Sequence, residues 1–230
     1  MSEARETVLG RLRAGLARPV ELRDAAAAAL EVRLRSPRPG PLPARATVVG
    51  EARIALFVRM AEAVGAEVRR LAGPEAIGGE LLDYFRRHDL RLRIVRAADP
   101  LLDAARLEEE PLLEVRTGVP EEPDPVGLTV ALAGIAETGT LLLASAAERP
   151  TLLAFLPETS IVALPTTAVV GTYEEAWTRL RGLPGWPPRS VNLITGPSRT
   201  GDIPPSIELG AHGPRRLLVL LVDRTPATSL

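Results

Sequence analysis

Residues 216–223, RLLVLLVD, form an almost continuously apolar run near the end of the 230-residue chain. The run lacks the polar alternation of a half-exposed strand, which is typical of a strand that is covered on both faces. Such strands occur mainly in parallel sheets that are flanked by helices. We therefore expect an α/β fold in which residues 216–223 lie inside a mainly parallel sheet.

Helical and strand-like segments alternate ahead of that run. Apolar residues recur at helical spacing over 51–63 and 74–88, and strand-like runs follow at 67–71 and 92–95. This alternation favours right-handed βαβ units. Residues 126–133 read as one further buried strand. A mainly parallel sheet flanked by helices is the fold class that the sequence predicts.

The chain is expected to begin with helices that precede this α/β region and pack either on it, as an intramolecular brace, or on a partner. An apolar face over residues 4–17 and the alanine-rich segment 20–34 predict two helices. The alternating prolines of SPRPGPLP then require an extended backbone that cannot pair inside a sheet. We predict an N-terminal helical arm over 1–36, a Pro-rich linker over 37–45 and an α/β domain over 46–230.

Overall charge and hydropathy exclude some classes of function. The formal net charge is -1 and the isoelectric point is near 6.2, which argues against binding nucleic acid or anionic membranes by bulk electrostatics. The longest apolar runs are far shorter than the roughly 18 residues of a membrane-spanning helix. The opening residues MSEARET contain no apolar signal-peptide core. We expect a cytoplasmic protein without a membrane span.

The chain contains neither cysteine nor lysine. Without cysteine it cannot ligate an iron–sulfur cluster through thiolates or use a thiol nucleophile. Without lysine it cannot form a Schiff base or a Walker-type phosphate site. A redox centre of the iron–sulfur type must therefore belong to another protein.

Residues 192–214, NLITGPSRTGDIPPSIELGAHGP, are the first candidate site. Gly196 and Pro197 end an apolar strand abruptly, so the polar residues that follow lie on the loop that leaves it. In open α/β sheets, loops at the carboxyl ends of strands form the ligand crevice. We expect such a crevice here.

The side chains of this loop suit a small anion. Arg199 offers a bidentate guanidinium for a carboxylate or phosphate, Ser198 and Thr200 can add hydrogen bonds, and Gly196 is expected to contact the ligand as well. Asp202 could orient Arg199, accept a hydrogen bond from a ligand hydroxyl or help to hold a metal, although we assign no metal ligand. His212 is the nearby side chain suited to proton transfer near neutral pH. The structural alternative is an Arg199–Asp202 ion pair with His212 bonded to a buried carbonyl.

Residues 134–140, GIAETGT, are the second candidate site. They connect two apolar runs, and their glycines would let the backbone approach a ligand. Glu137 could serve as an acid, a base or a nucleophile, with Thr138, Gly139 and Thr140 contacting substrate. The alternative is a turn carboxylate that accepts backbone N–H bonds.

Three motifs together resemble the lactate utilization protein C family, the LUD domain group: GIAETGT at 134–140, ITGPSRTGDI at 194–203 and LGAHGP at 209–214. The resemblance implies a fold similar to the NagB/RpiA/CoA-transferase group. It also implies a role in oxidising L-lactate to pyruvate beside iron–sulfur partner proteins, with a small carboxylate as ligand. No cofactor is expected within this chain.

Three functions remain open from the sequence. In the first, the chain is a subunit of a lactate-oxidising system. Arg199 binds the carboxylate, and His212 or Glu137 transfers the hydroxyl proton. In the second, it is a stand-alone enzyme in which Glu137 attacks an acyl thioester as in CoA-transferases. In the third, it is a non-catalytic sensing or assembly subunit that docks through its N-terminal helices.

Overall fold

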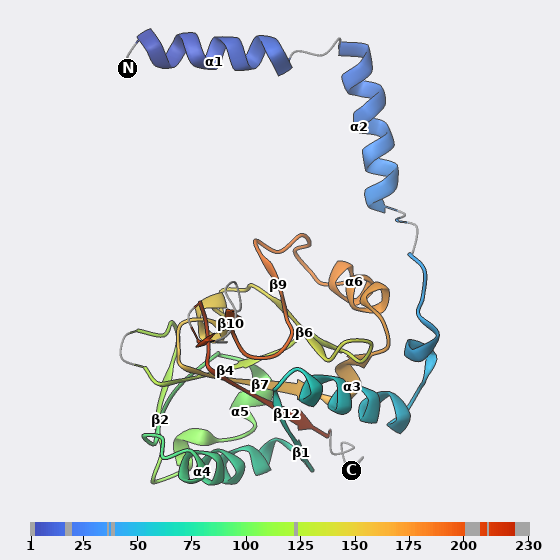
Figure 1. Cartoon of the computed structure of the whole chain (residues 1–230). Helices are drawn as coiled ribbons and strands as arrows, with labels where there is room; N and C mark the ends of the chain where they lie inside the picture. The colour runs from blue at the N-terminus through green and yellow to red at the C-terminus, as the bar shows by residue number, and fades with distance from the viewer. Residues whose placement is uncertain are drawn as a thin grey trace. The chain divides into compact units, whose positions relative to one another are not determined.

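The computed structural model describes residues 3–16, 20–35, 37, 40–121, 124–200, 208–210 and 212–223. The chain divides into two compact units, Met1–Pro41 and Leu42–Leu230, so the division falls inside the Pro-rich segment. The first unit contains the helices α1 (Glu3–Leu16) and α2 (Val20–Arg35) (Figure 1). Within the described ranges, no helix combines the length and apolar character needed to cross a bilayer.

A six-stranded sheet forms the centre of the second unit, and all of its pairings are parallel. Its strand order is β1-β12-β7-β4-β2-β3. The strands are β1 (Glu67–Leu71), β12 (Arg216–Val222), β7 (Thr159–Pro165), β4 (Val126–Val130), β2 (Arg93–Arg96) and β3 (Glu114–Thr117). Strand β12 pairs with β1 on one side and β7 on the other, which places the apolar run inside the sheet. The predicted α/β class with a mainly parallel sheet is confirmed.

A second, four-stranded sheet has the order β8-β5-β6-β9. Its strands are β8 (Val169–Val170), β5 (Ala133–Ile135), β6 (Thr140–Ala144) and β9 (Val191–Ile194). Strand β6 is antiparallel to both β5 and β9. The prediction of one strand over 126–133 was therefore wrong, because the chain leaves the large sheet after Val130 and enters the small one at Ala133. Both flanks of this break are buried, so hydropathy does not reveal it.

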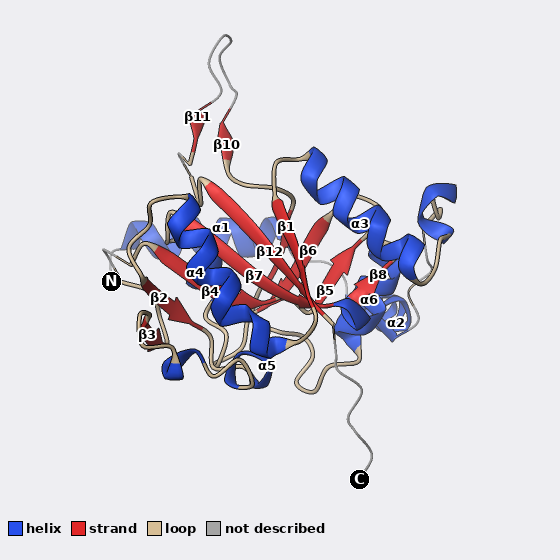
Figure 2. Cartoon of the chain, turned by 90° about the horizontal axis from the view of Figure 1, so that it is seen from below, coloured by secondary structure: helices blue, strands red, loops and turns tan. Residues whose placement is uncertain are grey.

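Helices and the small sheet cover the large sheet on its two faces (Figure 2). Helix α4 (Ile77–Arg87) covers one face through a buried cluster that includes Phe85, Ile94 and Leu220. Helix α3 (Glu51–Ala63) and the small sheet cover the other face through a cluster that includes Phe57 and Leu164. Helix α6 (Tyr173–Arg181) packs on the outer side of the small sheet. The remaining elements are α5 (Pro100–Asp103), the pair β10 (Arg199–Thr200) and β11 (Glu208–Leu209), and the 3-10 turns η1 (Ala44–Thr47), η2 (Pro74–Ala76), η3 (Leu107–Glu109), η4 (Thr151–Ala154) and η5 (Thr166–Ala168).

Asp124 fastens the edge strand β3 to the rest of the sheet. Its side chain is only 3% exposed, and it accepts a hydrogen bond of 2.7 Å from the backbone N–H of Glu121. It also pairs with Arg116, and Arg93 lies 3.4 Å from it. Burial acts to raise the pKa of Asp124, but the Glu121 N–H and the two guanidinium groups outweigh burial and hold that pKa below 3.8.

We expect Asp124→Asn to flatten the loss of stability in acid. A carboxyl group whose pKa is lower in the folded protein stabilises it fully above the unfolded-state value of 3.8, and this contribution is lost as the pH falls through the folded-state value. Melting temperatures between pH 7 and pH 2 should therefore converge for wild type and Asp124→Asn as the pH falls. Asp83→Asn is the control, since it removes only an exposed pair with Arg86. A constant gap between wild type and Asp124→Asn across this range would contradict the assignment.

Candidate ligand-binding site

The loop between β9 and β12 covers residues 195–214, and its described ends, 195–198 and 212–214, lie beside the amino ends of β7 and β12. The backbone N–H of Ser198 donates to the carbonyl of Pro214 at 2.9 Å, and the N–H of Gly210 donates to the carbonyl of Ser198 at 3.0 Å. These bonds hold the two arms of the loop together just before β12. The expected crevice at the carboxyl end of a parallel strand is therefore not what forms here, because β9 belongs to the small sheet.

A pocket lies beneath this loop and encloses about 580 Å³, part of it open solvent. Three predicted site residues line it, namely Gly196, Ser198 and His212. The rest of the lining is mainly apolar and consists of Ala154, Phe155, Ser160, Leu193, Ile194, Pro197, Gly213, Pro214 and Leu217. A largely apolar hollow with a few polar groups is typical of sites for small organic ligands.

Of the described residues that line the pocket, Ser160 is the one whose side chain is both polar and deeply buried. It is the second residue of β7, it is 1% exposed, and its Oγ has no hydrogen-bond partner among the described residues. Leaving a buried hydroxyl unpaired costs roughly 1–3 kcal/mol. Ser160 was not predicted from the sequence, where the only signal was a pair of hydroxyl residues, Thr159 and Ser160, at the start of an otherwise apolar strand.

The other predicted residues of this loop lie outside the pocket lining. Arg199 and Thr200 form β10, where they pair with Leu209 and Glu208 of β11. The guanidinium of Arg199 lies directly against Gly65, just after α3. Asp202 falls outside the described residues. The loop thus brings Ser198 and His212 to the pocket and directs Arg199 toward α3.

Glu137 occupies the turn between β5 and β6 and is not among the residues that line this pocket. Its side chain is 14% exposed, and its Oε1 lies 3.9 Å from Nη2 of Arg45. Its backbone N–H donates to the carbonyl of Gly171 at 3.0 Å, and its own carbonyl accepts from Nε of Arg45 at 3.3 Å. Glu137 and His212 therefore belong to different surroundings.

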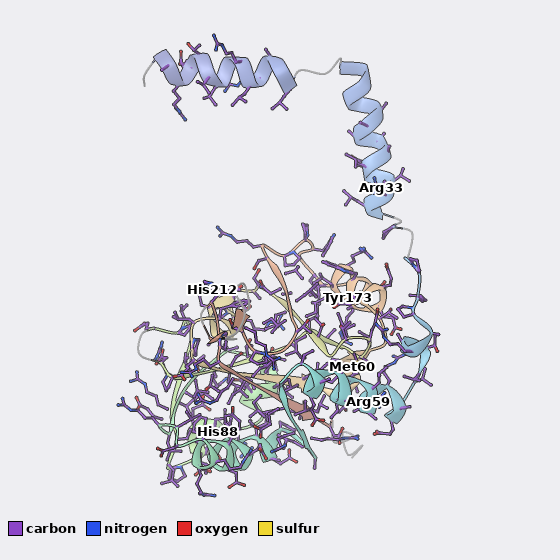
Figure 3. All side chains as sticks on the ribbon, in the orientation of Figure 1. Arg33, Arg59, Met60, His88, Tyr173 and His212 are labelled. Atoms are coloured by element: carbon purple, nitrogen blue, oxygen red, sulfur yellow. The ribbon has the colours of Figure 1, made fainter. Side chains whose placement is uncertain are left out.

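The motifs at 134–140 and 194–203 contact each other through a cluster of hydroxyl groups. Oγ1 of Thr140 lies 2.7 Å from Oγ1 of Thr138 and 2.7 Å from Oγ1 of Thr195. The hydroxyl of Tyr173, labelled in Figure 3, lies 3.0 Å from both Thr138 and Thr140. Thr140 is fully buried, so these bonds satisfy its hydroxyl inside the protein. The cluster links β6, β9 and α6. The hydroxyl groups of Thr138 and Thr140 therefore stabilise the fold through these bonds.

Two motif glycines make close backbone contact with helix α3. Gly139 has φ 68°, and a Cβ atom on it would lie 2.6 Å from Cα of Ala61. Gly196 has φ 75°, and a Cβ atom on it would lie 2.5 Å from the carbonyl oxygen of Val64. Any side chain would therefore be strained at both positions. The close approach that these glycines permit is to the end of α3.

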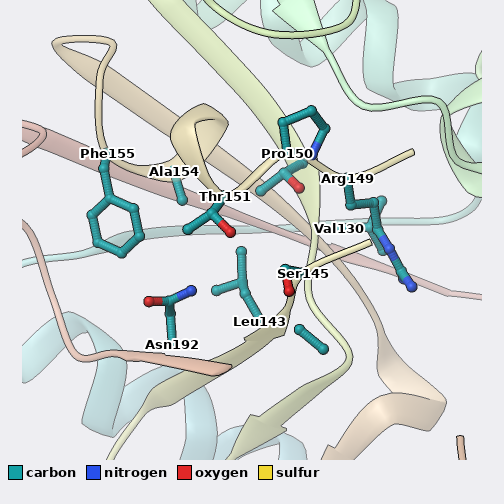
Figure 4. A pocket seen from close by; sticks show the side chains of 11 residues that line it. Val130, Leu143, Ser145, Arg149, Pro150, Thr151, Ala154, Phe155 and Asn192 are labelled. Carbon is teal, nitrogen blue, oxygen red and sulfur yellow. The ribbon is translucent and has the colours of Figure 1, made fainter. Parts of the chain in front are cut away.

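A smaller hollow shares a wall with the pocket. It encloses about 260 Å³, and Ala154 and Phe155 line both spaces. Figure 4 shows Phe155 beside Asn192 and Thr151 in this smaller hollow. Asn192 and Leu193 are neighbours on β9, and each lines a different one of the two hollows. Strand β9 and Phe155 thus separate the two hollows.

A third hollow lies at the carboxyl ends of the parallel strands, where α/β folds commonly bind ligands. It encloses about 1110 Å³, part of it open solvent, and its lining includes Asp99, Thr167, Arg179 and Asp223. Two of its carboxylates are already paired, Asp99 with Arg149 at 3.5 Å and Asp223 with Arg70 at 2.9 Å. The hydrogen bond from Arg70 lowers the pKa of Asp223. Within the described part of the chain, no group of three or more His, Asp or Glu side chains is arranged to hold a metal ion.

Comparisons with known proteins confirm the resemblance that the motifs predict. Residues 125–222 match the LUD domain. An uncharacterized protein of Neisseria meningitidis serogroup B is 36% identical over 96 residues, which are 42% of this chain and 41% of that protein. Lactate utilization protein C of Shouchella clausii is 33% identical over 100 residues, which are 43% of this chain and 44% of that protein. The matched segment thus spans less than half the length of these curated relatives.

A solved structure supports the fold. A DUF162 family protein from Deinococcus radiodurans superposes with a TM-score of 0.53, over 76% of this chain and 99% of that one. The two sequences are 18% identical over this superposition, so the likeness concerns the fold alone.

Proposed function

We propose, from the LUD-domain match over residues 125–222, that this chain is a cytoplasmic subunit of an L-lactate utilization system. It supports the oxidation of L-lactate to pyruvate together with iron–sulfur partner proteins. The observation that carries the proposal is one of position: every residue that lines the pocket beneath the 195–214 loop falls inside the matched segment. Relatives over this segment include proteins named lactate utilization protein C.

The chemistry of the pocket suits one part of that reaction. Oxidation of a 2-hydroxy acid to a 2-oxo acid removes two electrons, a hydroxyl proton and the proton on C2. The imidazole of His212 is exposed at the pocket and can accept a proton, while Ser198 can hydrogen-bond an acid oxygen. The chain has no cysteine for a thiolate-bound cluster, so partner proteins supply the electron acceptor.

Reconstitution with the iron–sulfur partners tests this function. Purified partner proteins should be reduced by L-lactate, as followed by bleaching of their visible absorbance, only when this chain is added. His212→Gln should lower the rate about 100-fold, the lower range for loss of general acid–base catalysis. His88→Gln is the matched control, because His88 lies at the end of α4 beside Glu67.

Two results would count against the proposal. One is lactate-dependent reduction that proceeds equally well without this chain. The other is failure of the tagged chain to co-purify with any iron–sulfur protein from cells grown on L-lactate. An unchanged rate with His212→Gln would remove His212 from the reaction while leaving the subunit role intact.

A further inference from the structure

Strand β7 begins with two buried hydroxyl residues that differ in one respect. Among the residues that the structure describes, neither Oγ1 of Thr159 nor Oγ of Ser160 has a hydrogen-bond partner, and the two residues are 0% and 1% exposed. Successive side chains on a strand point to opposite faces of the sheet. Ser160 therefore shares the face of Val162 and Leu164, which α3 and the small sheet cover, and Thr159 lies on the face that α4 covers. Only Ser160 lines the pocket.

An unpaired buried hydroxyl is uncommon in a folded protein. Thr159 lies on the face of the sheet that the core covers, whereas Ser160 is among the residues that line the pocket, with its Oγ covered in the ligand-free protein. A ligand oxygen would give the Ser160 hydroxyl the partner that no described residue provides. A buried polar group that is paired only by the correct ligand makes a site selective, because a ligand without the matching oxygen leaves that group unpaired.

The remaining lining defines what kind of ligand fits. Phe155 and Leu193 are partly exposed at 36% and 44% although both are large and apolar, and together with Leu217 they form an apolar wall. Ser198 and His212 supply hydrogen bonds on the loop side. The pocket therefore suits a small molecule with a short alkyl group at one end and two or three oxygen atoms at the other.

We propose that Ser160 is the anchoring residue of this pocket and that it binds a short-chain 2-hydroxy or 2-oxo monocarboxylate through an oxygen atom. The alkyl group of the acid packs on Phe155 and Leu193, and its other oxygen atoms bond to Ser198 and His212. This assignment rests on the proposed role in lactate utilization and names the residue that would make the pocket selective.

A pair of variants separates ligand binding from structure. Ser160→Ala and Thr159→Val each remove one unpaired buried hydroxyl, so each should raise the melting temperature of the ligand-free protein, by about 2 °C or more for a domain of this size. Only Ser160→Ala should weaken the ligand, about tenfold for the loss of a hydrogen bond to a charged group. A single substitution that stabilises the protein and weakens binding is the expected signature.

The experiment is isothermal titration calorimetry of the full chain against acetate, propionate, glycolate, L-lactate, D-lactate and pyruvate. We expect at least one 2-substituted acid to bind wild type and Thr159→Val equally and Ser160→Ala about tenfold more weakly. Equal binding of L-lactate to wild type and Ser160→Ala would overturn the role of Ser160 and leave the lactate function standing. Ser160-dependent binding of glycolate alone would support the anchor and contradict lactate as its ligand. If no acid binds wild type, the anchoring role is overturned, whereas the subunit role is judged by reconstitution.

Discussion

Gly139→Ala is expected to destabilise the protein by about 2–5 kcal/mol. Two costs add at this position: about 1–2 kcal/mol for forcing an L side chain into the left-handed region, and about 1–3 kcal/mol for overpacking. Both arise because φ is 68° and the new Cβ would lie 2.6 Å from Cα of Ala61. Urea denaturation followed by circular dichroism measures the loss.

Gly185→Ala separates the two costs. Gly185 also has a positive φ, 78°, but a Cβ atom placed there meets no atom within 4 Å. It should therefore show only the backbone cost of about 1–2 kcal/mol. If both variants lose the same stability, the contact between the β5–β6 turn and α3 contributes nothing, and the structural explanation of the motif glycine fails.

Phe57→Ala is expected to cost about 3–5 kcal/mol, the range for removing a buried aromatic side chain. Phe57 is fully buried on α3, in the cluster that joins this helix to both sheets. Its ring lies so close to Gly134 that a Cβ there would be 2.9 Å from Cε2 of Phe57. The loss should appear in the same urea denaturation experiment as a lower midpoint.

Phe155→Ala is the matched control for Phe57→Ala. Phe155 is 36% exposed and forms part of the pocket wall, so its removal deletes fewer core contacts and should cost clearly less. It should instead reduce the affinity for a ligand with an alkyl group. Equal losses of stability for Phe57→Ala and Phe155→Ala would contradict the placement of Phe57 in the core and of Phe155 in the pocket wall.

Much of the fold follows from local pattern. Helix α3 (Glu51–Ala63) was predicted with these bounds from its apolar spacing, and helix α6 (Tyr173–Arg181) begins after Thr172, a residue type that commonly caps helices. The cap is present, since the backbone N–H of Glu175 donates to Oγ1 of Thr172 at 3.2 Å. The change of sheet after Val130 could not be predicted, because the choice between two buried sheets depends on distant strands.

The residue types of the candidate site could be predicted from the sequence, whereas the direction in which each side chain points could not. Ser198 and His212 were chosen for their chemistry, and the structure brings both to one pocket. Arg199 was chosen on equal grounds, yet it lies against Gly65, because a two-residue strand fixes which way its side chain points. Ser160 was missed because the sequence does not show whether the hydroxyl of a buried serine has a hydrogen-bond partner.

A crystal structure of the protein with L-lactate would show whether the pocket beneath the 195–214 loop holds the acid. We predict density for lactate between Ser160, Ser198 and His212, with an oxygen atom within about 3.2 Å of the Ser160 hydroxyl. Lactate found instead in the hollow lined by Asp99, Arg179 and Asp223, with the pocket beneath the loop unchanged, would contradict this account.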